Sequence, residues 1–230
     1  MSRLVIISNR VGAPNAAAKG AAGGLAMALS AAIRRTSGIW FGWSGKTVAE
    51  YTGEIHVQDR AGVTVATVDL DPHDVEEYYN GYANSLLWPL FHYRTDLGGY
   101  ERAFGEGYLR ANVRFAAALR GLLRPDDLIW VHDYHLIPLA RELRALGVAN
   151  RIGFFLHIPW PPRRLLTTLP GHRKLVEALF DFDLVGFQTE DHLEAFCDYI
   201  RFEADGAVEP GLAHAFGRTT EVGAFPIGLD

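Results

Sequence analysis

The segment 128–138 reads LIWVHDYHLIP, and its character changes half-way along. Its first half is apolar, β-branched and aromatic, which is typical of a strand that is buried on both faces. Three ionisable side chains, His132, Asp133 and His135, then follow where the strand should end. In open α/β sheets, ligands bind outside the carboxyl ends of the strands. The segment therefore predicts a functional centre at this strand end.

The composition indicates a globular protein that binds a small molecule. The chain has 230 residues, of which 49% are hydrophobic, enough for the core of one large α/β domain or two small ones. A net charge of -5 without a basic run argues against a nucleic-acid partner. Cys197 is the single cysteine, so a reducing compartment is expected. With no signal-peptide pattern and no membrane-length apolar run, the sequence predicts a soluble cytoplasmic protein outside the membrane.

Strand-like and helix-like segments alternate along the whole chain. Alternating segments of this kind imply right-handed βαβ units, so the predicted fold is an α/β fold with a mostly parallel sheet flanked by helices. The segment 63–68 alternates enough to indicate an edge or an antiparallel pairing. Pro89 is expected to end or kink the helix that Asp71 and Pro72 begin. The expected strands are 4–7, 39–45, 55–57, 63–68, 128–132, 152–156, 184–187 and 221–225. One helix is expected to follow Gly24, and the other expected helices cover 71–88, 100–123, 136–146, 173–180 and 190–201.

Polar side chains follow four of the predicted strands, at the end that faces the next helix. They are Arg10, Asp133, His157 and Gln188. An arginine suits a phosphate, a carboxylate accepts hydrogen bonds from sugar hydroxyls, and a neutral imidazole makes one directed hydrogen bond. Together they favour a phosphorylated sugar as ligand. For a single residue an ordinary role is the alternative: Asp133 as a helix cap, His157 as a buried, hydrogen-bonded histidine.

Glycines and aromatic residues add weaker signals. Gly23 and Gly24 precede a helix-like pattern and would let an anion approach bare amides at the helix N-terminus, although a plain turn explains the pair equally well. Tyr79 and Trp88 could line a cleft, with packing in the core as the alternative.

Two other chemistries are disfavoured. His132, Asp133 and His135 are metal-binding residue types, but consecutive residues of a strand point to opposite faces, and no H-E-x-x-H cluster accompanies them. We therefore expect no metal. A serine hydrolase is disfavoured because the sequence has no G-x-S-x-G elbow.

Taken together, the ordered motifs resemble the N-terminal half of the trehalose-6-phosphate synthase family, which are retaining glycosyltransferases of the two-domain GT-B type. The resemblance implies that residues 1–230 form the acceptor-side Rossmann-like domain and that the C-terminal nucleotide-sugar domain is absent from the chain. The matching stretches are Ser8-Asn9-Arg10, Gly23-Gly24-Leu25, Trp40-Phe41-Gly42-Trp43-Ser44-Gly45, Tyr78-Tyr79-Asn80, Leu87-Trp88-Pro89, His132-Asp133-Tyr134-His135-Leu136, Phe154-Phe155-Leu156-His157-Ile158-Pro159, Gly186-Phe187-Gln188-Thr189 and Phe225-Pro226-Ile227-Gly228.

The same resemblance implies the substrates and the roles of residues. The acceptor would be glucose 6-phosphate, and the glucose would come from UDP-glucose or GDP-glucose, with UDP-glucose favoured. The family is described without a protein nucleophile and needs no cofactor. The implied acceptor contacts are Arg10 and Tyr79 at the phosphate, Trp88 nearby, Asp133 at the hydroxyls, and either Trp43 or Trp40 beside them. The implied nucleotide-glucose contacts are Gly23, Gly24, His157 and Ile158. Asp133 and His157 would lie nearest the reacting atoms.

Several alternatives stay open. Without its second domain the chain is expected to be an acceptor half-site with little transferase activity. A cyclitol-joining pseudo-glycosyltransferase and a non-catalytic sugar-phosphate-binding or regulatory module are the other functions that fit the motifs. Self-association is also open, because a half enzyme exposes an apolar surface.

Overall fold

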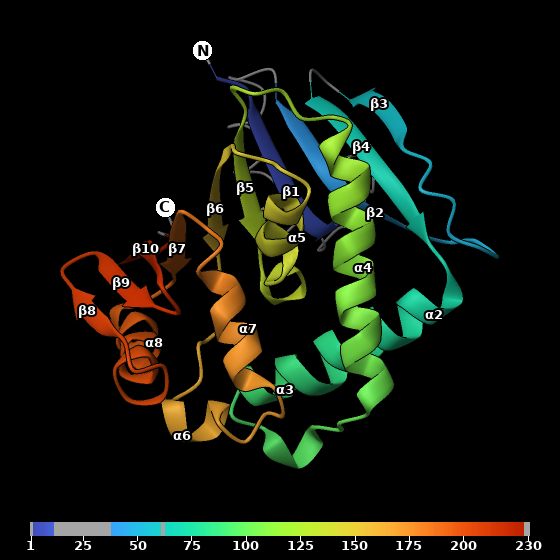
Figure 1. Ribbon diagram of the computed structural model, residues 1–230. Helices are drawn as coiled ribbons and strands as arrows, with labels where there is room; N and C mark the ends of the chain where they lie inside the picture. Colours follow the sequence, from blue (N-terminus) through green and yellow to red (C-terminus); the bar gives the residue numbers. More distant parts are fainter. Residues whose placement is uncertain (1, 12–37, 61–62, 228–230) are drawn as a thin grey trace.

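The computed structural model describes residues 2–11, 38–60 and 63–227, and in these ranges one ten-stranded mixed sheet organises the chain. The strand order is β3-β4-β2-β1-β5-β6-β7-β10-β9-β8 (Figure 1). The strands are β1 (Leu4–Arg10), β2 (Ile39–Thr47), β3 (His56–Arg60), β4 (Val63–Leu70), β5 (Leu128–His132), β6 (Arg151–Phe155), β7 (Leu184–Phe187), β8 (Ala207–Glu209), β9 (Leu212–Ala215) and β10 (Arg218–Ala224).

The pairings confirm the predicted mostly parallel sheet. Every neighbour pair from β4 to β10 is parallel, whereas β3 pairs antiparallel with β4 at one edge. The alternating pattern of 63–68 predicted an edge position or an antiparallel pairing; β4 has the antiparallel pairing, and β3 is the edge strand. The antiparallel hairpin of β8 and β9 at the other edge was not predicted, because its short strands carry no sustained apolar run.

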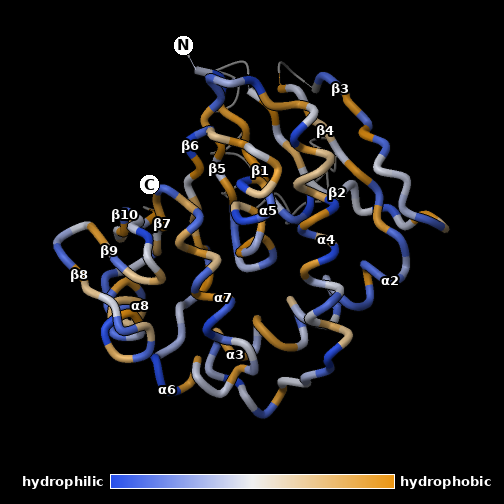
Figure 2. The backbone as a smooth tube through the Cα atoms, in the orientation of Figure 1, coloured by the Kyte–Doolittle hydropathy of each residue, from blue (hydrophilic) through white to orange (hydrophobic). Residues whose placement is uncertain are grey.

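Helices cover one face of the sheet. In Figure 1, α4, α5 and α7 lie in front of the strands, and the apolar residues of these helices join the main hydrophobic core. Figure 2 shows hydrophobic residues along the central strands, whereas α4 carries both hydrophobic and hydrophilic residues. The helices are α2 (Pro72–Asp74), η1 (Val75–Leu87), α3 (Trp88–Phe91), η2 (Thr95–Leu97), α4 (Arg102–Arg120), η3 (Tyr134–Leu136), α5 (Leu139–Ala145), α6 (Arg163–Leu166), α7 (His172–Leu179) and α8 (Glu190–Glu203).

The helix expected after Asp71 is present, but it changes type twice. The Asp71 carboxylate accepts a hydrogen bond from the Asp74 N–H at 2.9 Å, which confirms the predicted N-cap. A π-helix, η1, then runs from Val75 to Leu87 before α3 begins. The π-helix ends at Leu87, two residues before Pro89, and the helical path continues past this proline only as the short helix α3, which ends at Phe91. Similarly, the helix expected over 136–146 is divided into η3 and α5.

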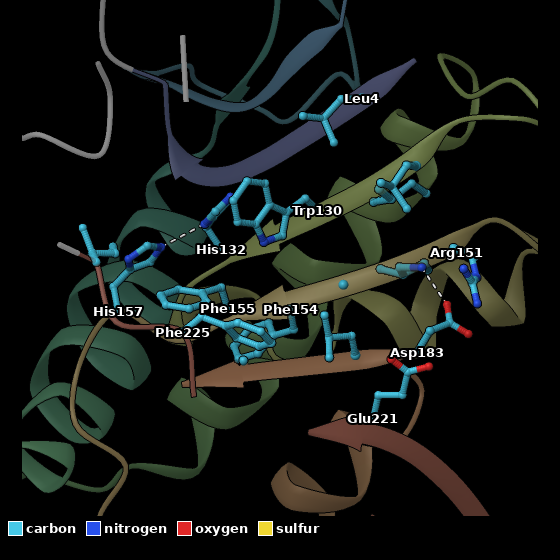
Figure 3. A pocket seen from close by; sticks show the side chains of 17 residues that line it. Leu4, Trp130, His132, Arg151, Phe154, Phe155, His157, Asp183, Glu221 and Phe225 are labelled. Carbon is cyan, nitrogen blue, oxygen red and sulfur yellow. Dashed lines mark hydrogen bonds between the residues drawn. The ribbon is translucent and has the colours of Figure 1, made fainter. Parts of the chain in front are cut away.

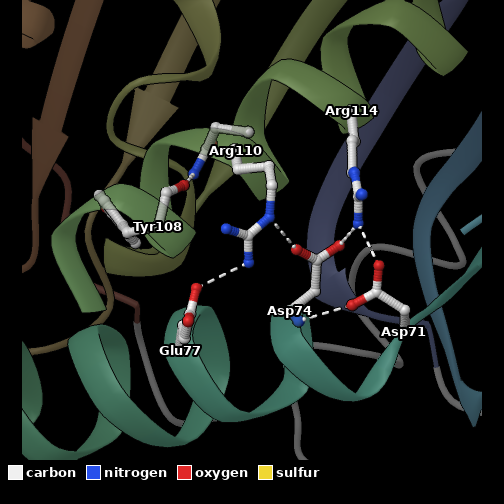
Figure 4. A network of polar contacts seen from close by, with 7 residues as sticks. Asp71, Asp74, Glu77, Tyr108, Arg110 and Arg114 are labelled. Carbon is white, nitrogen blue, oxygen red and sulfur yellow. Dashed lines mark hydrogen bonds and ion pairs between the residues drawn. The ribbon is translucent and has the colours of Figure 1, made fainter. Parts of the chain in front are cut away.

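An ion-pair network attaches α2 and the start of η1 to α4 (Figure 4). The Asp74 side chain is fully buried, and it binds Arg110 Nε at 2.9 Å and also Arg114. Arg110 reaches Glu77 at 2.8 Å, and Arg114 reaches Asp71 at 2.6 Å. Burial alone would raise the pKa of Asp71, but the hydrogen bonds from the Asp74 amide and from Arg114 outweigh it and lower this pKa. The network fixes η1 across the carboxyl ends of the strands, as Figure 1 shows.

The second face of the sheet carries a smaller hydrophobic cluster, consisting of Ile6, Val11, Trp40, Val63 and Val65. Gly23, Gly24 and the helix predicted after them lie outside the described residues. Of the helices in the described ranges, none combines the length and apolar character that crossing a membrane requires.

Candidate active site at the carboxyl ends of the strands

Arg10 is the last residue of β1, and its side chain lies beside Trp43 and Gly45 of β2. Its guanidinium carbon lies 5.6 Å from the centre of the Trp43 ring. A Cβ on Gly45, where φ is +86°, would come within 2.6 Å of the Arg10 side chain, so the absence of a side chain at Gly45 makes room for the guanidinium. Arg10 is exposed and therefore remains available to an anion.

A row of rings continues from Arg10 into the protein. Trp43 and Tyr79 lie edge to face with centroids 5.4 Å apart, and Tyr79 stacks on His135 at 5.9 Å. The structure thus brings Arg10, Trp43 and Tyr79 together. Trp40 does not join them, because it belongs to the cluster on the other face of the sheet, where its indole N–H donates to Ser8 Oγ at 2.8 Å.

Asp133 follows β5 with an unusual backbone conformation. Its φ of 76° and ψ of 166° fall in a region that glycine alone adopts without strain. The Asp133 N–H donates to the Phe155 carbonyl at 2.9 Å, and its carboxylate accepts from the His157 N–H at 3.3 Å. Burial raises the pKa of Asp133 to about 6. The side chain does not cap η3, so the helix-cap alternative is wrong.

His132 and His157 form a pair at the ends of β5 and β6 (Figure 3). His132 Nδ1 lies 2.8 Å from His157 Nε2, and the two rings are nearly parallel, with 25° between their planes. Burial and the neighbouring imidazole lower the pKa of His132 to about 3, and burial lowers that of His157 to about 4. Both rings are therefore neutral at pH 7.

The His132, Asp133 and His135 side chains do not converge. His132 faces His157, whereas His135 is buried beside Tyr79 and Tyr134. In the part of the chain that the structure describes, no group of three or more histidine, cysteine, aspartate or glutamate side chains is placed to hold a metal ion.

Trp88 lies at the rim of the site with a partner that was not predicted. Its ring, in a residue that is 42% exposed, lies 4.2 Å from the His92 ring, and His92 Nδ1 lies 2.7 Å from the Trp88 carbonyl. His92 also lowers the pKa of Asp133, which opposes the larger effect of burial. The signal for His92 was its spacing of four residues from Trp88 on a helix.

Gln188 and Ile158, the other predicted residues, each contact other parts of the protein. Gln188 Oε1 accepts a hydrogen bond from the Ile227 N–H at 3.3 Å. Ile158 is partly buried and packs against the main core.

An apolar groove of about 670 Å³ extends from the histidine pair over β5, β6, β7 and β10. His132 and His157 line one end, and Arg151 and Asp183 lie at the other (Figure 3). The rings of Phe155 and Phe225 pack closely on Gly186 in this groove, because a Cβ there would lie 2.8 Å from the Phe155 ring and 3.1 Å from the Phe225 ring.

The sequence and the fold are similar to those of known proteins. The model of glycosyltransferase family 20 matches residues 4–230. The chain belongs to glycosyltransferase family 20. A trehalose-6-phosphate synthase of Sinorhizobium fredii is 50% identical over 233 residues, which cover 100% of this chain and 50% of that protein.

Two solved structures show the same family 20 fold with ligands. A UDP-forming trehalose-phosphate synthase from Burkholderia xenovorans in complex with glucose 6-phosphate is 53% identical, with a TM-score of 0.93 over 99% of this chain and 51% of that one. The Escherichia coli protein bound with UDP-2-fluoro glucose is 43% identical, with a TM-score of 0.92 over 100% and 49% of the two chains. The chain thus spans about half the length of the relatives that it matches and corresponds to their N-terminal half.

Proposed function

We propose that this family 20 chain supplies the acceptor half-site of a trehalose-6-phosphate synthase, which transfers glucose from a nucleotide-glucose to glucose 6-phosphate with retention. The observation that carries the proposal is the row of Arg10, Trp43 and Tyr79 at the carboxyl end of β1, together with the Asp133 carboxylate, which a strained backbone holds at the end of the neighbouring strand β5. β1 pairs with β2 on one side and with β5 on the other. This is the switch point where open α/β sheets bind ligands.

In this proposal each acceptor residue has a role that follows from its chemistry. Arg10 and Tyr79 bind the phosphate, since one offers a charged fork of N–H groups and the other a phenol. The Trp43 ring holds the Arg10 guanidinium in place by a cation–π contact, and the exposed Trp88 side chain contacts the sugar. Asp133 accepts hydrogen bonds from sugar hydroxyls, and its link to the His157 N–H holds the carboxylate in place.

On the nucleotide-glucose side, His157 and Ile158 face the transferred glucose. The leaving phosphate and the incoming hydroxyl meet on one face of an oxocarbenium-like glucose. A transfer of this kind depends on positioning and on electrostatic stabilisation of the charge that develops. It requires no protein nucleophile, so His157 and Asp133 bind and orient the reacting groups.

The partner of this half-site is a nucleotide-binding domain like the second half of the relatives. UDP-glucose is the proposed glucose source, which the UDP-forming relatives support. The apolar groove next to His157 belongs to the surface that such a domain would meet. By itself the chain binds the acceptor and transfers little or no glucose. The reducing, cytoplasmic location expected from the single cysteine stays a prediction.

Isothermal titration with glucose 6-phosphate tests the proposal. The chain itself should bind, the Arg10→Ala variant should lose most of the affinity, and Arg124→Ala should bind normally. Arg124 is the matched control because it is also exposed but precedes β5, so it lies near the amino end of this strand and not at its carboxyl end. UDP-glucose is then added and trehalose 6-phosphate is assayed. Equal binding by all three chains would contradict the acceptor site, and product from this chain alone would contradict the half-site.

A further inference from the structure

His132 is a buried polar residue with a single hydrogen-bonding contact. It is 1% exposed, and its Nδ1 lies 2.8 Å from His157 Nε2. Its other ring nitrogen, Nε2, is buried without a hydrogen-bond partner among the described residues. Its ring also lies 4.5 Å from that of Trp130. The role proposed above for the strand ends uses Asp133 and His157 but leaves His132 unexplained.

The contact restricts where the protons of the pair can lie. Since both rings are neutral, each carries one N–H. One nitrogen of the contact must donate and the other must accept. If His157 donated, the proton of His132 would be on its Nε2, which is a buried N–H without an acceptor. If His132 donates, Nε2 is a bare lone pair instead. Among backbone groups, buried N–H groups without an acceptor are rarer than carbonyl oxygens with an unused lone pair. We extend this preference to the imidazole, which favours the second arrangement.

We propose that His132 is a positioning residue that donates its Nδ1–H to His157 Nε2 and thereby fixes His157 as the tautomer protonated at Nδ1. The free edge of the His157 ring then presents a hydrogen-bond donor. His157 is less buried than His132, and its Nδ1 has no hydrogen-bond partner in the described part of the chain. This nitrogen is therefore the one left for a ligand.

The consequence for the site rests on the proposed function. A nucleotide-glucose presents hydroxyl and phosphate oxygens, which are acceptors. An imidazole that is already oriented as a donor binds such an oxygen without first changing its tautomer, and pre-organisation of this kind lowers the cost of binding. The reversed tautomer would direct a lone pair at the same oxygen. His132 thus acts only through His157, from inside the protein.

The tautomer is measured directly on the intact 230-residue chain by long-range ¹H–¹⁵N correlation spectroscopy of the imidazole rings, at pH 7 and without ligand. The expected result is that both rings have the same tautomer, protonated at Nδ1 and bare at Nε2. A His157 ring protonated at Nε2 would overturn the proposal. This outcome does not depend on any substrate, so it stands apart from the titration that tests the proposed function.

Two variants separate a specific hydrogen bond from mere packing. His132→Asn keeps an N–H donor near the position of Nδ1 and should preserve the His157 tautomer. His132→Phe keeps a ring but removes the donor, and the Nδ1-protonated form should cease to be the major one. An unchanged His157 tautomer in a folded His132→Phe chain would contradict the proposal. If that variant does not fold, as its amide spectrum would show, the spectra of the unmodified chain and of His132→Asn decide.

Discussion

The Asp133 carboxylate accepts a hydrogen bond from the backbone N–H of His157 at 3.3 Å, and this contact joins the ends of two neighbouring strands. Asp133 makes it from a backbone conformation, with φ of 76° and ψ of 166°, that costs a non-glycine residue of the order of 1–3 kcal/mol. Backbone strain of this size persists where the surrounding structure holds it, and it gathers at functional sites. The relationship indicates that the carboxylate is kept at this position at the expense of stability.

The first prediction is that Asp133→Gly stabilises the chain while it removes acceptor binding. Glycine relieves the backbone strain and takes away a half-buried charge, so the free energy of unfolding at pH 7 should rise by about 1–3 kcal/mol. Urea unfolding followed by circular dichroism measures the change, and titration with glucose 6-phosphate measures the binding. Asp133→Ala is the matched variant, because it removes the charge but keeps the strain. A glycine variant no more stable than the alanine variant would show that strain is not the cause.

The second prediction concerns the dependence of stability on pH. The folded pKa of Asp133 is raised by burial to about 6, above its ordinary value of 3.8. Protonated Asp133 therefore favours the fold, and its contribution is complete below about pH 4 and is lost as the pH rises through about 6. Asp133→Asn is neutral at every pH. Relative to the unmodified chain it should gain about 1–2 kcal/mol between pH 4 and pH 7.5.

The measurement is a pair of urea titrations of both chains at pH 4, 5, 6, 7 and 7.5, values chosen to span the expected change. Taking the difference between the chains removes the contributions of the other titrating groups. A difference that stays constant across this range would mean that Asp133 has an ordinary pKa in the folded protein.

The central part of the fold could be predicted because each of its strands is recognisable from the few consecutive residues that form it. Apolar runs such as 4–7 and 184–187 lie on strands that are buried on both faces, and the residue after each run is at the carboxyl edge by geometry alone. For the same reason Arg10, Asp133 and His157 could be placed at one rim. The hairpin of β8 and β9 was missed because its short strands lack such a run.

What could not be predicted depends on contacts between distant segments. Trp40 and Trp43 are both apolar residues of one strand, and only the packing of each face shows that Trp43 lies by Tyr79 while Trp40 lies in the cluster on the other face. The pairing of His132 with His157 likewise requires the register of β5 against β6. The π-helical turns of η1 leave no clear signal, because their period differs little from that of an α-helix.

The third prediction is that Asp74→Ala weakens the chain strongly. The fully buried Asp74 carboxylate binds both Arg110 and Arg114, so its removal leaves two guanidinium groups with unpaired N–H donors. We expect a loss of the order of 2–4 kcal/mol in the free energy of unfolding. Since η1 also carries Tyr79, affinity for glucose 6-phosphate should fall as well. Urea unfolding and titration measure the two effects.

The control for this network is an exposed ion pair on α4. Arg102 and Glu106 are 2.9 Å apart, with side chains that are 88% and 65% exposed. Glu106→Ala should therefore change the stability by no more than about 0.5 kcal/mol. Equal losses for the two alanine variants would show that the buried network has no special role.

The fourth prediction is that Gly42→Ala disrupts the junction between β1 and β2. A Cβ on Gly42 would lie 2.1 Å from the Ser8 carbonyl oxygen, and backbone on two paired strands cannot move aside as a flexible side chain can. The two strands must separate locally, which should cost about 2–4 kcal/mol and shift Arg10 relative to Trp43. Gly99→Ala is the control, because a Cβ at Gly99 meets no atom within 4 Å, and it should change stability by less than about 0.5 kcal/mol. Thermal unfolding gives the first effect, and the loss of affinity for glucose 6-phosphate in isothermal titration gives the second. A Gly42→Ala chain as stable as the control would mean that β1 and β2 approach each other less closely than the structure has them.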